Sequence, residues 1–551
     1  MEDWRVAEYL VRACAELGIR HFFGVDGANI EDVYDAAARS AEAGGADVRG
    51  VVAKHEFAAA TMADGYARAT GGLGVVVATS GGGAMNLVAG LAESYTSGVP
   101  VLALVGQPPR NLEGRGAFQD TSGRAGSIDA LRLFGTVSRY CARVEQADEL
   151  PAQFAAAVAA ARGGGPAVLL LPKDIQCAPI EARPQRLDPA PVAGDPSGVA
   201  AVAAAVTAAR ATGKIVVIAG DQVARDDARD ALRELVTTVD AVVGVTPDGK
   251  DVYGAHEPGY AGVAGTMGHP ELVRMAQSAA LCLLVGTRLP GTALIPLGDV
   301  PLAGIGAQPP YLPAVHATAA DLAVALPELT AAIRESAGAT GSSDAVAEPI
   351  GGTRLQPPAA AGPGLRYRPV MEVISELLLT GSAVFADAGN TGAAAVHYLD
   401  LPADGRFGLA LGMGGMGYSF GAAIGAAFAT GRPTYVIAGD GAFLMHGLEV
   451  HTAIEYALPI TFVILNNNAH AMCVVRERLY LRHADGRNRF GRAMLAEGMA
   501  AMFPGLPCHA VRELSGLRTA LTATGDGPRF VAIDCDPDEM PPFVPFLAAD
   551  A

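Results

Sequence analysis

Short apolar runs alternate with Ala-rich stretches along most of the chain. The runs are rich in Val and Ile, which is typical of strands buried on both faces of a sheet. The stretches between them, such as 56–70 and 198–211, have the period of helices. This alternation predicts repeated α/β units with parallel sheets. The predicted strands lie at 75–79, 101–105, 168–171, 215–220, 282–286, 435–439 and 461–465.

Two interruptions divide this pattern. Segment 179–197 is rich in Pro, and segment 337–364 is rich in Gly, Ser, Pro and Ala, as exposed linkers are. We therefore expect three doubly wound domains with mainly parallel sheets, over residues 1–182, 190–338 and 362–551. In such sheets, ligands bind beyond the carboxyl ends of the strands.

Composition and charge exclude several classes of protein. Half of the 551 residues are hydrophobic, which excludes a disordered chain. The net charge of −17 argues against a partner that is a nucleic acid or an anionic membrane. No apolar run reaches the ~20 residues of a membrane span. The seven cysteines are scattered without zinc-ligand spacing, and the N-terminal residues do not resemble a targeting peptide, so we expect a cytoplasmic protein.

The strongest chemical signal lies in the third block. The strand at 435–439 runs into Asp440 and Gly441, and a helix is predicted over 443–456. The next strand ends at three consecutive asparagines, Asn466 to Asn468, with 24 residues between Gly441 and Asn466. One βαβ crossover fits this length, so both groups should emerge at the same edge of the sheet. A carboxylate, an amide and a backbone carbonyl suit Mg²⁺ together with phosphate oxygens, and the helix start offers N–H groups to phosphates.

This motif resembles the thiamin-diphosphate binding motif. The resemblance extends over most of the chain to the acetolactate synthase large subunit and 2-oxo acid decarboxylase family. It is carried by KHEFAAATMADGYARATG, VVVATSGGGAMNLVAGLAESYTSGVPVLALVGQPPR and GPAVLLLPKDIQ in the first block, and by DAGNTGAAAVHYL and MGGMGYSFGAAIGAA in the third. It is weaker in the middle block. The three domains would then be pyrimidine-binding, central and diphosphate-binding.

The resemblance implies a role for individual residues. Asp440, the Asn467 side chain and the carbonyl of Ala469 would hold Mg²⁺. The Gly414 carbonyl would accept a hydrogen bond from the 4′-amino group of the cofactor, and Met416 would wedge the cofactor into its bent shape. The remaining residues implied in cofactor binding are Asn390, Thr391, Gly439, Gly441 and Ala442.

Glu56 matches the glutamate of this family that faces N1′ of the pyrimidine. A carboxyl there favours the imino tautomer, whose imine takes the proton from C2 of the thiazolium. Its apolar surroundings permit the raised pKa that such work needs. Without the other motifs, Glu56 would read as a carboxylate at a helix start. In the family, this glutamate reaches the diphosphate site of another subunit, so the resemblance implies a homodimer or a dimer of dimers with active sites between chains.

Several positions depart from the family pattern around the substrate. Asn29 stands in a loop that has neither the usual Pro nor the decarboxylases' Asp, and it either faces substrate or caps the next helix. His446 is either a proton donor or a packed side chain. His470 and Arg476 are polar candidates for gripping an unusual substrate, although a surface position for Arg476 is an equal alternative. Phe118 and Gln119 match a family pair near the reacting carbons.

The middle block departs in another way. Flavin-binding relatives carry a Gly-(Ala/Thr)-Arg-Phe-Asp-Asp run, which here reads GTRLPGTALIPL, and the later acidic residue is absent from LAGIGAQPP. Arg288 alone is retained. We therefore expect a central domain without a functional flavin site, so that FAD is not among the expected cofactors.

These observations predict a thiamin-diphosphate- and Mg²⁺-dependent lyase or transferase. It would decarboxylate a 2-oxo acid and add the resulting enamine to a second carbonyl compound, as an acetolactate-synthase-like carboligase does. Three alternatives stay open: a non-ligating decarboxylase, an enzyme of specialised metabolism with a different donor, and a scaffold without turnover. The sequence does not identify the donor, the acceptor or the pathway.

Overall fold

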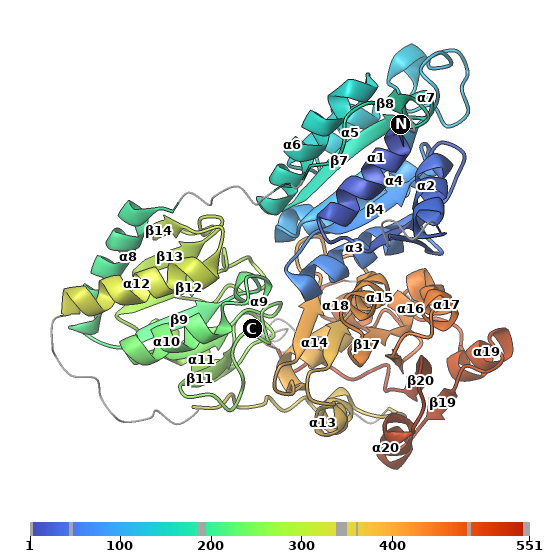
Figure 1. Cartoon of the computed structure of the whole chain (residues 1–551). Helices are drawn as coiled ribbons and strands as arrows, with labels where there is room; N and C mark the ends of the chain where they lie inside the picture. The colour runs from blue at the N-terminus through green and yellow to red at the C-terminus, as the bar shows by residue number, and fades with distance from the viewer. Residues whose placement is uncertain are drawn as a thin grey trace.

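Three six-stranded parallel sheets, one in each third of the chain, form the framework of the protein. The computed structural model describes residues 4–42, 48–185, 187, 194–337, 350–359, 362–481 and 486–543. Figure 1 shows the N-terminal domain at the top, the central domain at the left and the C-terminal domain below. Much of the two predicted boundary stretches lies outside the described residues, so the exact domain bounds stay predictions.

The N-terminal sheet has the order β3-β2-β4-β5-β7-β6. A short antiparallel pair, β1 (Trp4–Arg5) with β8 (Pro179–Ile180), joins the beginning of this domain to its end. The strands of the sheet are β2 (His21–Val25), β3 (Arg49–Val52), β4 (Gly74–Ala78), β5 (Val101–Gln107), β6 (Tyr140–Arg143) and β7 (Pro166–Pro172). The helices are α1 (Val6–Glu16), α2 (Glu31–Glu42), α3 (Glu56–Thr70), α4 (Gly82–Ser97), α5 (Ala130–Gly135), α6 (Leu150–Arg162) and α7 (Lys173–Gln176), with 3₁₀ turns at Arg124–Gly126 and Ala147–Glu149.

The central sheet has the order β11-β10-β9-β12-β13-β14, so the strand order reverses between β9 and β12. Its strands are β9 (Ile215–Ala219), β10 (Val242–Val245), β11 (Tyr260–Val263), β12 (Leu281–Val285), β13 (Leu302–Gly306) and β14 (Val315–Thr318). Its helices are α8 (Pro196–Arg210), α9 (Gln222–Arg225), α10 (Arg229–Val239), α11 (Pro270–Gln277) and α12 (Leu322–Ala337).

The C-terminal sheet has the order β16-β15-β17-β18-β20-β19. Its strands are β15 (Ala383–Ala386), β16 (Arg406–Leu409), β17 (Thr434–Gly439), β18 (Ile460–Asn466), β19 (Cys508–Val511) and β20 (Arg529–Asp534). Its helices are α13 (Tyr367–Leu377), α14 (Asn390–Tyr398), α15 (Tyr418–Thr430), α16 (Asp440–His446), α17 (Val450–Glu455), α18 (Ala471–Tyr480), α19 (Leu495–Met502) and α20 (Leu514–Thr522), with a 3₁₀ turn at Gly447–Glu449.

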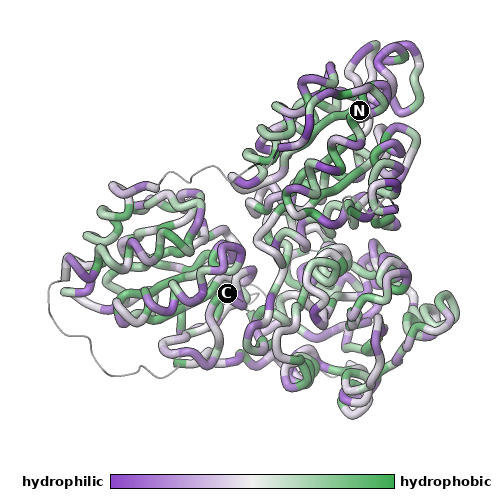
Figure 2. Tube along the Cα trace, in the orientation of Figure 1, coloured by the Kyte–Doolittle hydropathy of each residue, from purple (hydrophilic) through white to green (hydrophobic). Residues whose placement is uncertain are grey.

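Every apolar run that the pattern singled out as a strand is one, with ends shifted by at most two residues. These strands form the apolar interior of each domain, as Figure 2 shows by their colour. The single helix predicted over 443–456 is instead α16, a 3₁₀ turn and α17. Gly447 packs so closely that a Cβ atom there would lie 2.1 Å from the Phe443 ring, and the break turns Glu449 toward the N-terminal domain.

Helices α3 and α15 join the N-terminal and C-terminal domains through small residues. A Cβ atom on Gly65 would lie 2.0 Å from the carbonyl oxygen of Ala422, and one on Gly425 would lie 1.9 Å from that of Met62. Glycine is therefore required at both positions for the backbones to approach. This contact fixes the start of α3 and the loop before α15 relative to each other.

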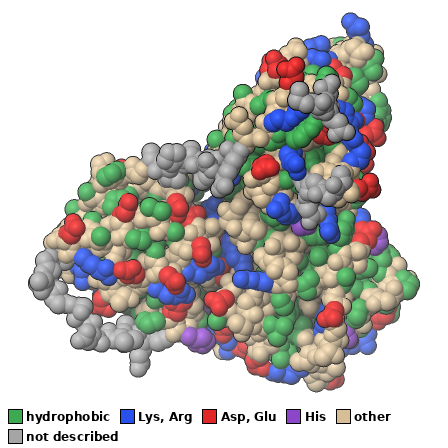
Figure 3. Space-filling view, viewed as in Figure 1, with side chains coloured by type: hydrophobic (Ala, Val, Ile, Leu, Met, Phe, Trp, Pro, Cys, Tyr) green, Lys and Arg blue, Asp and Glu red, His purple; other side chains and the backbone are tan. Residues whose placement is uncertain are grey.

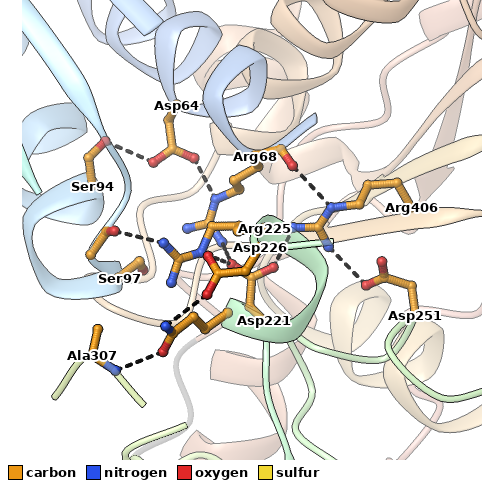
Figure 4. A network of polar contacts seen from close by, with 12 residues as sticks. Asp64, Arg68, Ser94, Ser97, Asp221, Arg225, Asp226, Asp251, Ala307 and Arg406 are labelled. Atoms are coloured by element: carbon orange, nitrogen blue, oxygen red, sulfur yellow. Dashed lines mark hydrogen bonds and ion pairs between the residues drawn. The ribbon is translucent and has the colours of Figure 1, made fainter. Parts of the chain in front are cut away.

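A buried network of charged side chains connects all three domains (Figure 4). Arg68 of α3 pairs with Asp64 at 2.7 Å and with Asp221 of the central domain at 3.2 Å. Arg406 of the C-terminal domain pairs with the same Asp221 and with Asp251, the latter at 2.9 Å. The nearby arginines hold the pKa of the Asp221 carboxyl well below its usual range, against the effect of burial. The central domain is thus attached to the other two by paired charges.

On the face of the molecule drawn in Figure 3, acidic and basic side chains are interspersed. Among the described residues, no helix is both long and apolar enough to cross a membrane.

Candidate functional site

The predicted metal edge is formed by the ends of two neighbouring strands. β17 pairs in parallel with β18, with Gly439 opposite Leu465, so Asp440 and Asn467 leave the sheet side by side. The Asp440 carboxylate is 2% exposed and faces the backbone N–H groups of Gly441, Asn467 and Ala469. Burial outweighs these bonds and raises the pKa of Asp440 to about 6. A cation at this carboxylate would offset the cost of burying its charge.

Asn467 is oriented by two hydrogen bonds. Its Nδ2 donates to the hydroxyl of Tyr367 across 2.8 Å, and its Oδ1 accepts from the Ala469 N–H across 3.0 Å. The amide oxygen is therefore turned toward the Asp440 side, with a lone pair still available. Among the described residues, no group of three or more His, Cys, Asp or Glu side chains could hold a metal. A cation here would need one carboxylate with neutral oxygen donors, which fits Mg²⁺ with phosphate oxygens and water.

Asn390 and Thr391 lie at the same edge, at the start of α14. Both side-chain polar atoms of Asn390 are buried without a hydrogen-bond partner, although the residue is only 6% exposed. A Cβ atom on Gly439 would lie 3.4 Å from Thr391 Oγ1, which places Thr391 beside the metal loop. Buried unpaired amides are costly, so the orphaned Asn390 fits a polar group that binds between it and Asp440.

Gly441 has two of the predicted site residues as neighbours. A Cβ atom there would lie 2.5 Å from His470 Cδ2 and 3.3 Å from Met416 Cε. His470 also packs against the edge of Phe490, with ring centroids 4.7 Å apart. The structure thus brings Met416 and His470 to the predicted metal edge, together with the buried Ala442.

The loop at 412–417, which carries Gly414, is held at both ends by carboxylates that the sequence analysis did not identify. Glu93 of α4 accepts from the N–H groups of Gly412, Met413 and Gly414. Asp387, directly after β15, accepts from the N–H of Gly417 across 2.9 Å. Asp387 stands at the end of a strand and could have been suspected on that ground, whereas Glu93 gives no signal within its Ala-rich helix.

Glu56 is the first residue of α3 and is 9% exposed. Its Oε2 accepts a hydrogen bond from Asn86 Nδ2 across 2.9 Å, and a Cβ atom on Gly83 would lie 3.0 Å from its Oε1. His55, which precedes it, caps α3 by accepting from the Phe57 N–H through Nδ1 at 3.0 Å. The carboxylate is therefore held at the carboxyl edge of the N-terminal sheet.

The predicted substrate residues differ in how exposed they are and in what they contact. Gln119 lies near Thr79, whose hydroxyl is 3.4 Å from its Oε1, while Phe118 is 77% exposed. Asn29 is buried and donates through Nδ2 to the Ser80 hydroxyl across 2.7 Å, so its side chain is engaged within the protein.

His446 lies at the interface between the N-terminal and C-terminal domains. Its ring centroid is 4.5 Å from that of Phe57 and 5.2 Å from that of His55. Burial, and to a lesser degree the neighbouring His55, lowers the pKa of His446 to about 4. At neutral pH it is therefore an uncharged, packed side chain beside the helix that carries Glu56.

The central sheet has a crevice of the kind that binds nucleotides in other proteins, but here a side chain fills it. In a doubly wound sheet, that crevice lies where the strand order reverses, here between β9 and β12. The Gln222 side chain occupies this position: its Nε2 donates to the Ala319 carbonyl at 3.0 Å, and its Oε1 accepts from the Ala307 N–H at 2.9 Å. A Cβ atom on Gly286 would lie 3.0 Å from Gln222 Cβ. These residues do not fit a flavin in this crevice.

Three family models match the chain. They are the N-terminal TPP binding domain of thiamine pyrophosphate enzymes over residues 4–126, the central domain of these enzymes over 199–299, and their C-terminal TPP binding domain over 387–535. The three matches fall on the three sheets described above, and together they cover more than half of the chain.

Known proteins of this kind are similar to this chain over most of its length. The acetolactate synthase isozyme 2 large subunit of Escherichia coli is 28% identical over 98% of this chain and 97% of its own. Sulfoacetaldehyde acetyltransferase of Alcaligenes xylosoxydans is 27% identical over 84% of this chain and 81% of its own. The solved structure of a thiamine diphosphate-dependent 4-hydroxybenzoylformate decarboxylase of Rhodococcus jostii shares the fold, with a TM-score of 0.80, 21% identity, and coverage of 97% and 99%. The chain therefore belongs to the thiamine pyrophosphate enzymes, and among them it is similar to the acetolactate synthase large subunits.

Proposed function

We propose that this enzyme binds thiamin diphosphate with Mg²⁺, decarboxylates a 2-oxo acid and joins the remaining fragment to a second carbonyl compound. The observation that carries the proposal is the edge at which Asp440, Asn467 and the unpaired Asn390 converge. The resemblance to the E. coli acetolactate synthase subunit supports ligation as the outcome. We also propose that the three domains span residues 1–182, 190–338 and 362–551. We propose a cytoplasmic location for the protein.

Residues at the edge of the C-terminal sheet would bind the diphosphate and the cation, and Glu56 at the edge of the N-terminal sheet would act on the pyrimidine. When bound, thiamin diphosphate would supply a C2 carbon that, once deprotonated, adds to a ketone, and a thiazolium ring that takes up the electron pair left by departing CO₂. Asp440, Asn467 and the Ala469 carbonyl would hold the cation, and Asn390 and Thr391 the diphosphate. The small residues Gly439, Gly441 and Ala442 would let the diphosphate approach the backbone at this point.

Glu56 would act on the other end of the cofactor. Its carboxyl group, oriented by Asn86, would hold a proton at N1′, while the Gly414 carbonyl accepts from the 4′-amino group. Met416 would support the bent shape between these two ends. We propose Asn29, Phe118, Gln119, His446 and His470 as the substrate side of the site, with Gln119 best placed, since Asn29 is occupied by Ser80.

The proposed active site lies between two chains. Met413, Leu444, Met445 and Leu448, close to the cofactor loop and to Asp440, expose more than half of their side chains. Exposed apolar side chains beside a functional site are typical of an interface. They support a homodimer, or a dimer of dimers, as the active form.

A second candidate is a decarboxylase that protonates the fragment without ligation. The proximity of His470 to Gly441 favours it, because an imidazole beside the metal edge is a possible proton donor. A donor other than pyruvate is compatible with either reaction.

A turnover screen distinguishes these reactions. The purified protein is loaded with thiamin diphosphate and Mg²⁺, and offered pyruvate alone and then pyruvate with aldehydes and 2-oxo acids, with products identified by mass spectrometry. A 2-hydroxyketone product supports the ligase, and an aldehyde alone supports the decarboxylase. If pyruvate is inert, larger or charged 2-oxo acids are tested as donors. Absence of turnover with every donor, despite cofactor binding, would contradict the proposed function.

A further inference from the structure

The Glu93 carboxylate joins two domains at the loop that carries Gly414. Glu93 lies in α4 of the N-terminal domain and is 3% exposed. Its Oε1 accepts from the N–H of Gly412 at 3.0 Å, and its Oε2 accepts from the N–H groups of Met413 at 2.6 Å and Gly414 at 3.2 Å. Ser97 completes the set by donating its hydroxyl to Oε1 at 2.9 Å. One buried carboxylate thus holds three successive backbone groups of a distant segment.

The loop depends on these bonds because it is otherwise little supported. Gly414 is exposed, has a φ of +65°, and would have no atom within 4 Å of a Cβ. Met413 is 59% exposed, so side-chain packing does not fix this part of the loop. Asp387 holds the far end, at Gly417 and Ser419. Glu93 therefore determines where the first half of the loop lies.

A carboxylate satisfies this arrangement, whereas an amide does not. The carboxylate offers two oxygens that accept from all four donors, whereas a glutamine would turn an N–H₂ group toward one pair of them. Hydrogen bonds to a charged acceptor are about twice as strong as those between neutral groups. The geometry explains why a glutamate is buried at a domain junction with no cationic side chain bonded to it among the described residues.

We propose that Glu93 is a positioning residue for proton removal from the cofactor. This inference rests on the proposed function, in which the Gly414 carbonyl accepts from the 4′-amino group. Glu93 touches neither cofactor nor substrate and acts through the loop. Because Asp440, Asn467 and Asn390 would hold the diphosphate independently, displacement of the loop should slow deprotonation at C2 more than it weakens cofactor binding.

The test compares Glu93→Gln and Glu93→Asp with Ser97→Ala, which removes a donor to Glu93 but leaves its bonds to the loop. Two readouts need no substrate: amide hydrogen exchange of the peptide over 410–418 in the cofactor-free protein, and hydrogen–deuterium exchange at C2 of bound thiamin diphosphate. The dissociation constant of the cofactor is measured in parallel.

We expect Glu93→Gln to speed amide exchange at Met413 and Gly414 by roughly 10- to 100-fold and to slow C2 exchange by a similar factor. Cofactor affinity should change by no more than about threefold, and Ser97→Ala should resemble the wild type. If Glu93→Gln does not fold, Glu93→Asp, which keeps the charge but shortens the side chain, must slow C2 exchange.

The outcomes separate this proposal from the proposed function. Faster amide exchange with unchanged C2 exchange in both variants would make Glu93 a structural contact only and overturn the proposal. If amide exchange in the cofactor-free protein were unchanged, Glu93 would not hold the loop in place, and the proposal would also be overturned. Failure of the wild type to bind thiamin diphosphate would instead contradict the proposed function.

Discussion

Both oxygens of the Glu449 carboxylate lie 3.1 Å from the backbone nitrogen of Lys54. Lys54 is two residues before Glu56, so a residue of the C-terminal domain fixes the chain at the start of the helix that carries the proposed catalytic carboxyl. The Thr452 hydroxyl also donates to Glu449, at 2.6 Å. The contact with Lys54 depends on the break between α16 and α17, because a continuous helix would point Glu449 in a different direction.

Glu449 should make the stability of the protein depend on pH. Burial raises the pKa of its carboxyl to about 7, although the bonds from Thr452 and Lys54 lower it. The folded state thus holds this proton more tightly than the unfolded chain does. The resulting stabilisation is complete below about pH 4.5 and is lost as the pH rises through 7.

The Glu449→Gln variant should therefore lose this dependence. We expect the difference in stability between wild type and variant to change by roughly 3 kcal/mol between pH 5 and pH 8, with the wild type relatively weaker at pH 8. Unfolding midpoints at four pH values measure it. Glu455→Gln, at a half-exposed neighbour that pairs with Lys54, is the control. A difference that does not vary with pH would show that Glu449 titrates normally.

Replacing Glu56 by Gln should separate binding from activation. The amide is isosteric but cannot hold a proton at N1′, so C2 exchange of bound thiamin diphosphate should slow by roughly 100- to 10,000-fold. The cofactor dissociation constant should stay within a few-fold of the wild type. Glu31→Gln, at the start of α2, changes another carboxylate at a helix start and should have no effect on C2 exchange. If C2 exchange in Glu56→Gln were as fast as in the wild type, Glu56 would have no role in deprotonating the cofactor.

The Asp440→Ala variant should lose stabilisation by the cofactor. A ligand at 100 times its dissociation constant stabilises the folded state by about 2.7 kcal/mol, which appears as a rise in the thermal midpoint. Asp440→Ala should show no such rise with thiamin diphosphate and Mg²⁺. Asp230→Ala, which alters a fully exposed carboxylate of the central domain, should show all of it. An unchanged rise in Asp440→Ala would contradict the metal assignment.

Asn390 should contribute to cofactor binding but not to the stability of the cofactor-free protein. Because both of its polar atoms are buried and unpaired, Asn390→Ala should leave the cofactor-free protein as stable as the wild type, or more stable by about 1 kcal/mol. The same change should reduce the stabilisation that the cofactor provides. Thermal midpoints with and without thiamin diphosphate test both effects. A variant that is destabilised equally in both states would indicate that Asn390 serves the fold alone.

The charge network of Figure 4 should depend on every partner. Arg406→Met would leave Asp221 with fewer cationic neighbours and Asp251 without its contact to the C-terminal domain. Breaking a buried pair by removing one side typically costs 3–5 kcal/mol, so we expect a loss of about that size in urea unfolding. Arg432→Met, which changes an exposed arginine of the same domain, is the control. Equal stabilities of the two variants would show that the network contributes little.

The sequence by itself determined the three sheets and the closeness of the two strand ends that carry Asp440 and Asn467. Runs of Val and Ile that alternate with helical segments are typical of parallel strands buried on both faces. The spacing from Asp440 to Asn467 places two strand ends together, because one crossover fits between neighbouring strands. The family motifs added Glu56, Asn390 and Gly414, whose roles depend on a cofactor rather than on contacts within the chain.

Only the tertiary structure revealed Glu93, Glu449 and Asp221. Each is a carboxylate that, besides a local partner, bonds to groups more than 150 residues away in the sequence. A helix or turn containing such a residue looks the same in the sequence whether the charge is solvated or buried. Gln222 could not be assigned either, because its neighbours in the crevice come from the ends of strands far along the chain. Local periodicity fixes secondary structure, whereas a buried polar group is defined by donors that the fold brings to it.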